Sequence, residues 1–235
     1  MDELLAEARY LGIKLSPQQI NAFSRYQELL QSWNRRASLT TVDDPRGIRV
    51  RHFLDSLTCA AVTGNLDGQR LIDVGAGAGF PGLPLKILYP RLQLTLLESV
   101  TKKVRFLEAV VEELGLQDVQ VLDARAETIG QDAAFRESYD WAVARAVASL
   151  AVLLEFLLPL CRVGGHALAM KSDRAHMEAE DAANAIATLG GAQPVFYPVQ
   201  LPERDKTSFL VVVEKIAPTP ARFPRRPGMP AKRPL

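Results

Sequence analysis

The stretch from Leu71 to Gly82 reads LIDVGAGAGFPG and decides the fold class of this chain. Its first four residues are typical of a buried β-strand, and glycine then occupies the alternate positions 75, 77 and 79. Glycines in this pattern let a backbone turn pass close to a ligand, because a side chain there would obstruct the approach. They also lower helix and strand propensity without a gain in packing, which favours a ligand site over a bare turn.

Outward from this turn, short apolar runs alternate with segments of helical length. Such alternation predicts βαβ units and a mostly parallel sheet, and therefore an α/β fold of the Rossmann-like kind. The runs lie at Leu71–Val74, Leu94–Leu97, Val119–Leu122, Trp141–Val143 and Ala167–Met170.

Two helices and a hairpin complete this predicted core. An apolar stripe from Val104 to Leu114 ends at Gly115, which is a plausible helix C-cap, and a further helix is expected across Ala175–Leu189. The runs Pro194–Val199 and Phe209–Val213 are separated by only about ten residues, too few for a parallel crossover. They are therefore predicted to form an antiparallel terminal hairpin.

The first 65 residues are predicted to be helical. Ser16 followed by Pro17 and Gln19 is typical of a helix start with a capping box, and apolar residues from Ile20 to Trp33 recur at helical spacing. We therefore expect a helical N-terminal extension over residues 1–65, a core over residues 66–215, and a basic Pro- and Arg-rich tail over residues 216–235.

Two classes of ligand fit the glycine turn. Residues 77–82 match the dinucleotide pattern GxGxxG, but Pro81 and Pro84 remove backbone donors where a diphosphate would need them. Glu98, nineteen residues beyond Gly79, can accept both hydroxyl hydrogens of an adenosine ribose. Asp73 and the three glycines suit S-adenosylmethionine, whose ammonium a carboxylate can help bind. The methyl donor is favoured over a nicotinamide cofactor.

The sequence also bears on which chemical group accepts the methyl. The segment after the fourth strand, Ala142–Ala146, carries no acid or Asn followed by Pro-Pro-aromatic, which disfavours exocyclic amines. Methylation of carbon 5 of a pyrimidine needs a nucleophilic thiolate, and neither Cys59 nor Cys161 falls at a strand end of the required kind. A ring nitrogen with a free lone pair, such as guanine N7, could attack the methyl directly and needs no base. A small-molecule acceptor would look similar.

Composition sets wider bounds. The chain has 235 residues, of which 48% are hydrophobic and 23% charged, as in ordinary globular proteins. The tail holds five bases and no acid, which leaves 23 bases against 27 acids elsewhere. The sequence predicts no transmembrane helix, export signal, disulfide framework or metal cluster. Both cysteines are expected to be reduced and buried, and the protein is expected to be a cytoplasmic monomer.

Several segments beyond the glycine turn resemble one family. The chain resembles RsmG, the bacterial 16S rRNA guanine-N7 methyltransferase, also called glucose-inhibited division protein B, over nearly its whole length. The most specific parts are the Phe-Pro-Gly continuation of the turn, the segment Arg145–Leu150 and the segment Pro224–Gly228. The matching segments are Arg51–Leu57, Ile72–Pro84, Leu96–Ser99, Lys102–Leu107, Arg125–Glu127, Ala144–Leu150 and Phe223–Gly228.

The resemblance implies a class I S-adenosylmethionine-dependent methyltransferase fold with a helical N-terminal extension. It also implies that the target is guanine at nucleotide 527 in the 530 loop of 16S rRNA, with the small subunit as partner. An acceptor there must lie in a loop or be flipped out, because the deep major groove of A-form RNA admits no active site. The donor is implied to contact Gly75, Phe80, Glu98, Ala126, Glu127 and Arg145, to which the turn adds Asp73, Gly77 and Gly79.

Roles in turnover are expected at two basic residues. Arg145 follows the fourth strand, where donor and acceptor meet; the alternative is a salt bridge to Asp140 or Glu127. Lys171 could position the acceptor or be solvated. His52 and Asp55 are expected to be a structural pair that docks the N-terminal part. The tail cations are expected to grip rRNA, and they are Arg222, Arg225, Arg226, Lys232 and Arg233.

Two alternatives stay open. A methyltransferase acting on a small molecule or a protein would share the donor site, and a nicotinamide-binding Rossmann protein would share the strand and turn.

Overall fold

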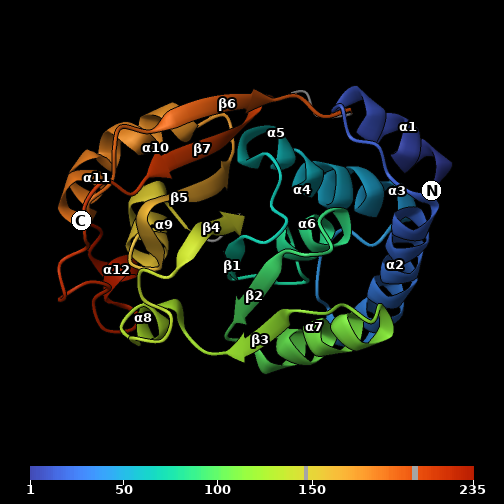
Figure 1. Cartoon of the computed structure of the whole chain (residues 1–235), viewed down its shortest axis with the longest axis horizontal. Coiled ribbons are helices and arrows are strands. Elements are labelled where there is room, and N and C mark those ends of the chain that lie inside the picture. Colours follow the sequence, from blue (N-terminus) through green and yellow to red (C-terminus); the bar gives the residue numbers. More distant parts are fainter. Residues whose placement is uncertain (146–147, 203–205) are drawn as a thin grey trace.

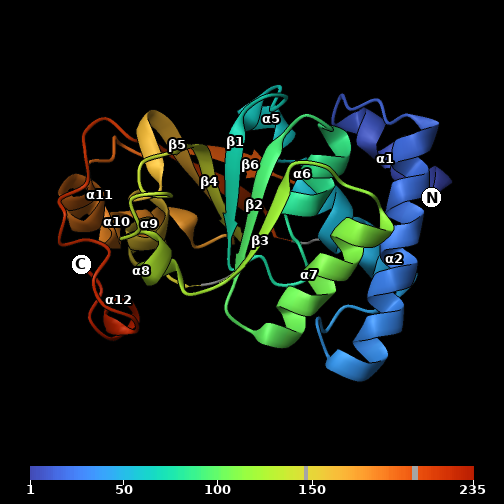
Figure 2. The same cartoon turned by 60° about the horizontal axis from the view of Figure 1, so that its bottom comes forward.

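The computed structural model describes residues 1–145, 148–202 and 206–235. A central sheet carries helices on both faces (Figures 1 and 2). The sheet has seven strands in the order β3-β2-β1-β4-β5-β7-β6. The strands are β1 (Arg70–Val74), β2 (Gln93–Glu98), β3 (Val119–Asp123), β4 (Tyr139–Arg145), β5 (Cys161–Lys171), β6 (Val195–Val199) and β7 (Ser208–Glu214).

The predicted sheet is confirmed. Strands β1 to β5 pair in parallel, β7 runs antiparallel to β5, and β6 runs antiparallel to β7 as the expected hairpin. The chain leaves β1 toward β2 on one side and later returns to β4 on the other. The carboxyl ends of β1 and β4 therefore flank the point where open α/β sheets bind ligands.

Alternate residues along each strand supply two separate cores. One core holds Leu71, Val143 and Leu168 together with the N-terminal helices and helices α6 (Gly82–Leu88) and α7 (Thr101–Glu113). The other holds their strand neighbours Ile72 and Ala142 with helices from the C-terminal half. These helices are α8 (Ala126–Ile129), α9 (Leu150–Leu157), α10 (Ala175–Asp181) and α11 (Ala183–Leu189).

The N-terminal extension is confirmed as helical, and it shares the first core with the sheet. Ser16 and Gln19 form the predicted capping box at the start of α2, and Tyr26 lies within that core. The extension contains α1 (Asp2–Tyr10), α2 (Pro17–Ala37), α3 (Pro45–Gly47), a π-helix η1 (Ile48–Leu54), α4 (Asp55–Leu57) and α5 (Ala60–Thr63).

Two predicted helices have different outcomes. Helix α7 ends as expected, with Gly115 in the left-handed region at φ 60°. The helix predicted across 175–189 is instead two helices, α10 and α11, which meet at Ala182. Ala182 is fully buried with φ −88° and ψ 1°, so the bend keeps both short helices against the sheet. No Gly or Pro marks it in the sequence.

The tail is packed against the sheet domain. After β7 the chain runs back beside α8 and α9 and ends in α12 (Met229–Lys232), as Figure 2 shows. Phe223 is buried in the second core. Among the described residues, none of the helices is long and apolar enough to cross a membrane.

Candidate functional site

The glycine turn after β1 brings its three glycines into the left-handed region. Gly75, Gly77 and Gly79 have φ of 70°, 61° and 95°. A Cβ on Gly79 would lie 2.4 Å from Leu83 Cδ1 and 2.5 Å from the Tyr26 hydroxyl. A Cβ on Gly77 would meet only the Gly75 carbonyl oxygen, at 3.9 Å. Packing therefore requires glycine at 79, whereas at 77 a side chain would project into open space.

This difference predicts a large loss of stability for one alanine variant and a small loss for the other. Gly79→Ala is expected to lower the free energy of unfolding by several kcal/mol, because its Cβ overlaps core atoms at a strained φ. Gly77→Ala is expected to cost only about 1 kcal/mol and to weaken ligand binding at the turn. Urea unfolding and ligand titration of both variants check this. Equal stability losses would contradict it.

Asp73 lies beneath the turn and is fully buried. Its Oδ2 accepts the Gly82 N–H at 2.7 Å, and its Oδ1 has no hydrogen-bond partner among the described residues. Burial raises the pKa of Asp73 to about 7 against the opposing effects of the Gly82 bond and Arg145. Asp73 thus stabilises the turn from behind, and its contact with a donor stays a prediction.

The raised pKa of Asp73 predicts a pH-dependent stability. The folded protein keeps a proton on Asp73 that the unfolded chain releases above pH of about 4. The free energy of unfolding is therefore expected to fall as the pH rises from about 4 to about 7, the pKa of folded Asp73. Denaturant unfolding across this range, compared with Asp73→Asn, isolates the effect. Parallel profiles for the two proteins would contradict it.

Glu98 at the end of β2 is held by backbone donors. Its Oε2 accepts the Gly77 N–H at 2.9 Å, and its Oε1 accepts the N–H groups of Ser99 at 2.8 Å and Val100 at 2.9 Å. The residue is 6% exposed. A carboxylate offers about four lone-pair sites, so Glu98 retains capacity for a further donor such as a hydroxyl.

Three adjoining cavities lie at the carboxyl ends of the strands. Cavity A, about 250 Å³, is lined by Glu98, Glu127 and residues of α9 that include Val152 and Phe156. Cavity B, about 380 Å³, runs along the turn past Gly77 to Phe80 and Arg145. Cavities A and B share Gly75, Glu98 and Ser99, so they are parts of one groove.

Cavity C, about 330 Å³, lies on the far side of Arg145. It is lined by Lys171 of β5, Phe209 of β7 and Asp55 of α4, among other residues. It shares only Arg145 and His52 with cavity B. Arg145 and His52 therefore form the wall between the turn groove and cavity C.

The acid that pairs with Arg145 is Asp55, and neither Asp140 nor Glu127 contacts it. Its Nη1 donates to Asp55 Oδ2 at 3.2 Å and to the Arg51 carbonyl oxygen at 2.9 Å, and its Nη2 lies 3.2 Å from His52 Nδ1. Asp140 pairs instead with Arg162, at 2.7 Å. The rest of the resembling segment includes Ala146 and Val147, which lie outside the described residues.

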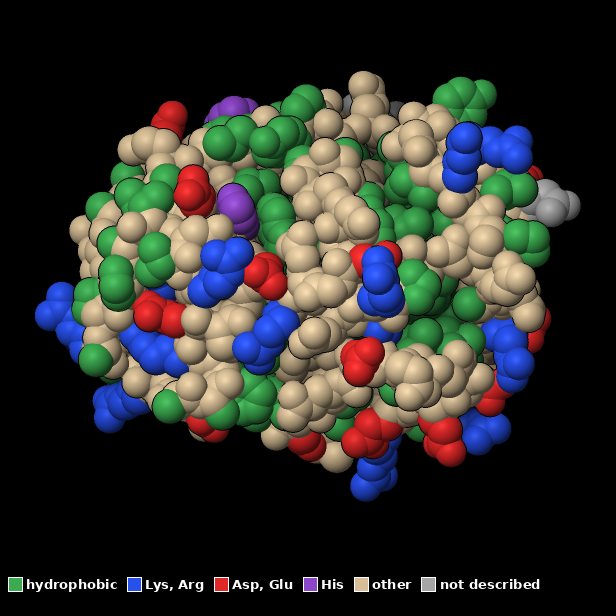
Figure 3. Space-filling model, viewed as in Figure 1, with side chains coloured by type: hydrophobic (Ala, Val, Ile, Leu, Met, Phe, Trp, Pro, Cys, Tyr) green, Lys and Arg blue, Asp and Glu red, His purple; other side chains and the backbone are tan. Residues whose placement is uncertain are grey.

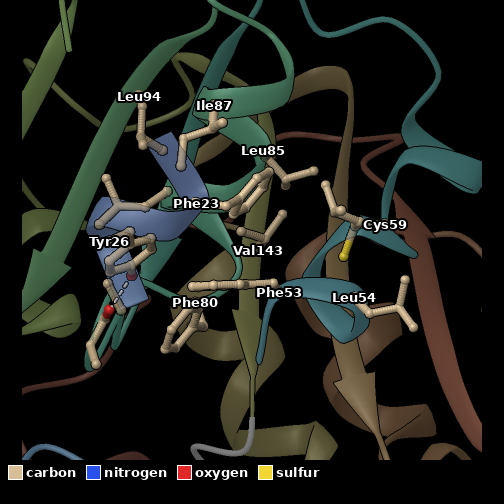
Figure 4. Packing of buried hydrophobic residues seen from close by; sticks show 14 of the residues in the cluster. Phe23, Tyr26, Phe53, Leu54, Cys59, Phe80, Leu85, Ile87, Leu94 and Val143 are labelled. Carbon is tan, nitrogen blue, oxygen red and sulfur yellow. Dashed lines mark hydrogen bonds between the residues drawn. The ribbon is translucent and has the colours of Figure 1, made fainter. Parts of the chain in front are cut away.

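An aromatic stack supports this wall from the N-terminal helices. The ring of Phe80 lies 4.5 Å from that of His52 and 5.5 Å from that of Tyr26, and the Arg145 guanidinium lies 4.9 Å above Phe80. The Tyr26 hydroxyl donates to the Ala78 carbonyl oxygen. Figure 4 shows Tyr26, Phe53 and Phe80 together in this packing. The N-terminal extension thus holds the turn and the wall in place.

His52 and Asp55 do more than form a local pair. The expected one-turn spacing falls within a π-helix, η1, and its junction with α4. Both side chains lie against Arg145 of β4. No sequence signal marks a π-helix. The interpretation of His52 and Asp55 as a structural pair therefore missed that both lie at the candidate site.

Lys171 is buried rather than solvated. Its Nζ lies 2.6 Å from Glu178 Oε2 and donates to the Ala148 carbonyl oxygen at 2.7 Å. Glu178 also accepts the N–H of Leu150, at the start of α9. Lys171 lines cavity C, but its ammonium is engaged by α10 and by the segment before α9, so its role toward an acceptor stays a prediction.

The five tail cations occupy different positions. Arg222 lies over the ring of Phe223, and Arg222, Arg226, Lys232 and Arg233 are exposed. Arg225 is not part of a free basic arm, because its side chain pairs with the fully buried Glu155 of α9. A charged residue such as Glu155 inside an apolar run is a sequence signal for a buried ion pair.

Ala126 and Glu127 begin α8 beside cavity A. Glu127 is 7% exposed, and its Oε1 accepts the N–H of Gly228 from the tail at 2.9 Å. The groove thus has an open glycine, two nearly buried acids and an unpartnered carboxylate oxygen beneath it. These features fit a ligand with hydroxyl donors at one end and a cationic group at the other, as S-adenosylmethionine has.

Comparisons with known proteins bear on this site. Residues 19–206 match the GidB family, described as rRNA small subunit methyltransferase G. The chain is 52% identical over its full length to the ribosomal RNA small subunit methyltransferase G of Roseiflexus castenholzii, whose whole length it covers. It belongs to the GidB family. The corresponding protein of Alkaliphilus metalliredigens is 44% identical, over 96% of this chain and 94% of that protein.

Solved structures agree on the fold. A SAM-dependent methyltransferase from Aquifex aeolicus superposes with a TM-score of 0.55 at 16% identity, covering 75% of this chain and 97% of that one. A SAM-dependent O-methyltransferase from Thermotoga maritima also gives 0.55 at 14% identity, covering 77% of this chain and 73% of that one. This member of the GidB family is thus a methyltransferase with the class I fold, and S-adenosylmethionine is its methyl donor.

The two thiols are poorly suited to nucleophilic chemistry. Cys59 and Cys161 are free and buried, as predicted. Burial raises the pKa of Cys161 to about 12 and that of Cys59 well above its usual range. A thiol that holds its proton this strongly is a poor nucleophile.

Proposed function

We propose that this chain methylates N7 of a guanine in 16S rRNA, at nucleotide 527 in the 530 loop of the small ribosomal subunit. Full-length relatives named for small-subunit rRNA methylation support the RNA substrate. The resemblance to the RsmG family supports the atom and the position. The structural observation that carries the proposal is Arg145, which lies in the wall between two cavities.

The donor is assigned to the groove formed by cavities A and B. Glu98 accepts a ribose hydroxyl hydrogen, Ala126 and Glu127 contact the adenosine end, and the turn with Gly75, Gly77 and Phe80 holds the amino-acid end. Glu98 is oriented for this by three backbone N–H groups. Asp73 lies buried beneath the turn, and its Oδ1, which has no hydrogen-bond partner among the described residues, adds a negative potential behind the amino-acid end.

The acceptor guanine is assigned to cavity C. This cavity of about 330 Å³ reaches the turn groove only at Arg145 and His52. Met170 and Leu210 line it and give it an apolar wall against which a base can pack. A single base turned out of its stack could enter such a cavity, whereas an intact duplex could not.

Guanine N7 suits a site of this kind. When bound, the donor supplies a sulfonium methyl, which passes to the N7 lone pair while the carbon–sulfur bonding pair returns to sulfur. N7 carries no proton, so the chain's task is alignment and electrostatics. Asp55 pairs with Arg145 and offsets its charge beside an acceptor that becomes positive on methylation.

The exposed tail cations are assigned to contacts with rRNA phosphates. Arg222, Arg226, Lys232 and Arg233 are exposed at the end of the chain. On the face seen in Figure 3, Lys and Arg side chains are mixed with Asp and Glu. A small set of tail cations would add salt-dependent affinity without contributing to methyl transfer.

The test is transfer of labelled methyl from S-adenosylmethionine to small subunits or 16S rRNA that lack the modification. We expect 7-methylguanosine, identified by mass spectrometry and mapped to the 530 loop. Label at another atom or nucleotide would overturn the finer assignment. If neither RNA form accepts label while the donor binds, the acceptor is a small molecule or a protein.

A further inference from the structure

The C-terminal tail follows a path that ends at cavity A. The Arg136 guanidinium donates to the carbonyl oxygens of Thr219 and Phe223 at 2.7 Å each, and Gln131 donates to the Pro224 carbonyl oxygen at 2.8 Å. These bonds hold the tail against the segment that follows α8. Helix α12 then packs against α9 (Figure 1).

A buried carboxylate anchors the middle of this path. Glu155 is fully buried in α9, and its oxygens accept three groups from one tail residue. The Arg225 backbone N–H and Nε donate to Oε1 at 2.9 and 2.8 Å, and Nη2 donates to Oε2 at 2.5 Å. A buried charge held by both the backbone and the side chain of one residue fixes the position of the tail as well as its charge.

Beyond this anchor the tail contributes to the cavity itself. Gly228 and Ala231 line cavity A together with Glu98. Gly228, with φ 80°, donates its N–H to Glu127 Oε1 at 2.9 Å. Glu127 thus has one oxygen committed to the tail, and the direction of its carboxylate depends on the presence of Gly228.

We propose that residues 223–231 are a structural part of the methyl-donor site. Arg225, clamped on Glu155, delivers Gly228 to Glu127 and Ala231 to the rim of cavity A, which fixes the Glu127 carboxylate and closes the adenosine end of the groove. This inference rests on the proposed assignment of adenosine to cavity A. The GidB family model matches residues 19–206 and does not extend to this part of the tail.

Two kinds of tail variant separate this role from a contact with RNA. Deletion of residues 227–235 removes Gly228 and Ala231 but leaves Arg225 on Glu155. Its matched control, Lys232→Ala with Arg233→Ala, removes the same two charges and keeps the backbone. The dissociation constants of S-adenosylmethionine and S-adenosylhomocysteine are measured by calorimetry, and KM for small subunits is measured separately.

The deletion is expected to weaken binding of both nucleosides by about tenfold or more, the effect of losing a hydrogen bond to a charged group and one wall of the cavity. The double alanine variant is expected to bind both within about twofold of the wild type. Equal donor affinity in deletion and wild type overturns the inference, as does an equal loss in the deletion and the alanine variant.

A third variant covers a deletion that fails to fold. Ala231 is exposed on α12 and lines cavity A, so Ala231→Trp leaves the fold intact and obstructs the cavity. It is expected to weaken donor binding by about tenfold with an unchanged melting temperature. Unchanged donor affinity overturns the inference. If the wild type itself binds no donor at Glu98, tested with Glu98→Ala, the proposed function fails instead.

Discussion

Arg225→Ala is expected to lower the free energy of unfolding by about 3 kcal/mol, with a fall of roughly 6–12 °C in melting temperature for a chain of this size. The reason is Glu155, which is fully buried and would lose its partner charge and three side-chain hydrogen bonds. We take the lower end of the range for broken buried pairs because the Arg225 side chain is 23% exposed. Urea unfolding measures the loss.

The neighbouring arginine provides the control. Arg226 is exposed, and Arg226→Ala is expected to change stability by no more than about 0.5 kcal/mol. The double variant Arg225→Ala with Glu155→Leu is expected to recover much of the loss, because it removes the stranded carboxylate from an apolar helix. A double variant less stable than Arg225→Ala alone would show that the buried charge is not the cause.

Arg145→Ala is expected to lower kcat/KM for methyl transfer by roughly 100-fold or more. The change removes the wall between cavities B and C and takes the ion pair with Arg145 away from Asp55, which is 5% exposed. Arg145→Lys is not expected to rescue activity, because an ammonium cannot reach Asp55, His52 and the Arg51 carbonyl oxygen together. Single-turnover kinetics with saturating donor measure the effect on transfer.

A second arginine pair serves as the control for this experiment. Arg162 pairs with Asp140 on the surface, near the amino-terminal ends of β5 and β4 and so at the opposite edge of the sheet from Arg145. Arg162→Ala is expected to retain full activity and to cost no more than about 1 kcal/mol of stability. Activity of Arg145→Ala within about threefold of wild type would remove Arg145 from the transfer step.

Local patterns predicted the parts of the fold that depend on local chemistry. The capping box at Ser16, the C-cap at Gly115 and the five parallel strands all follow from residue spacing, and the structure confirms them. The break at Ala182 and the π-helix η1 carry no such signal. Both depend on how a helix must bend to keep its buried residues against the rest of the molecule.

The candidate site likewise has parts that local sequence predicts and parts that only the structure shows. The glycines and Glu98 were found because a strand followed by a tight turn has a sequence signature. The ion-pair partner of Arg145 is Asp55, ninety residues away in the chain, and not one of the two acids that the alternative interpretation named. The sequence predicted that all five tail cations contact rRNA, but the structure pairs Arg225 with a buried acid.

The sequence by itself determined the fold class, the strand–turn motif and the family, because each is written in contiguous residues whose spacing sets backbone conformation. Tertiary structure alone decided which charge meets which: Asp55 with Arg145, Glu155 with Arg225, and Gly228 with Glu127. The physical reason is that a pairing between distant residues depends on where packing brings their elements. Charge type and sequence position do not contain that information.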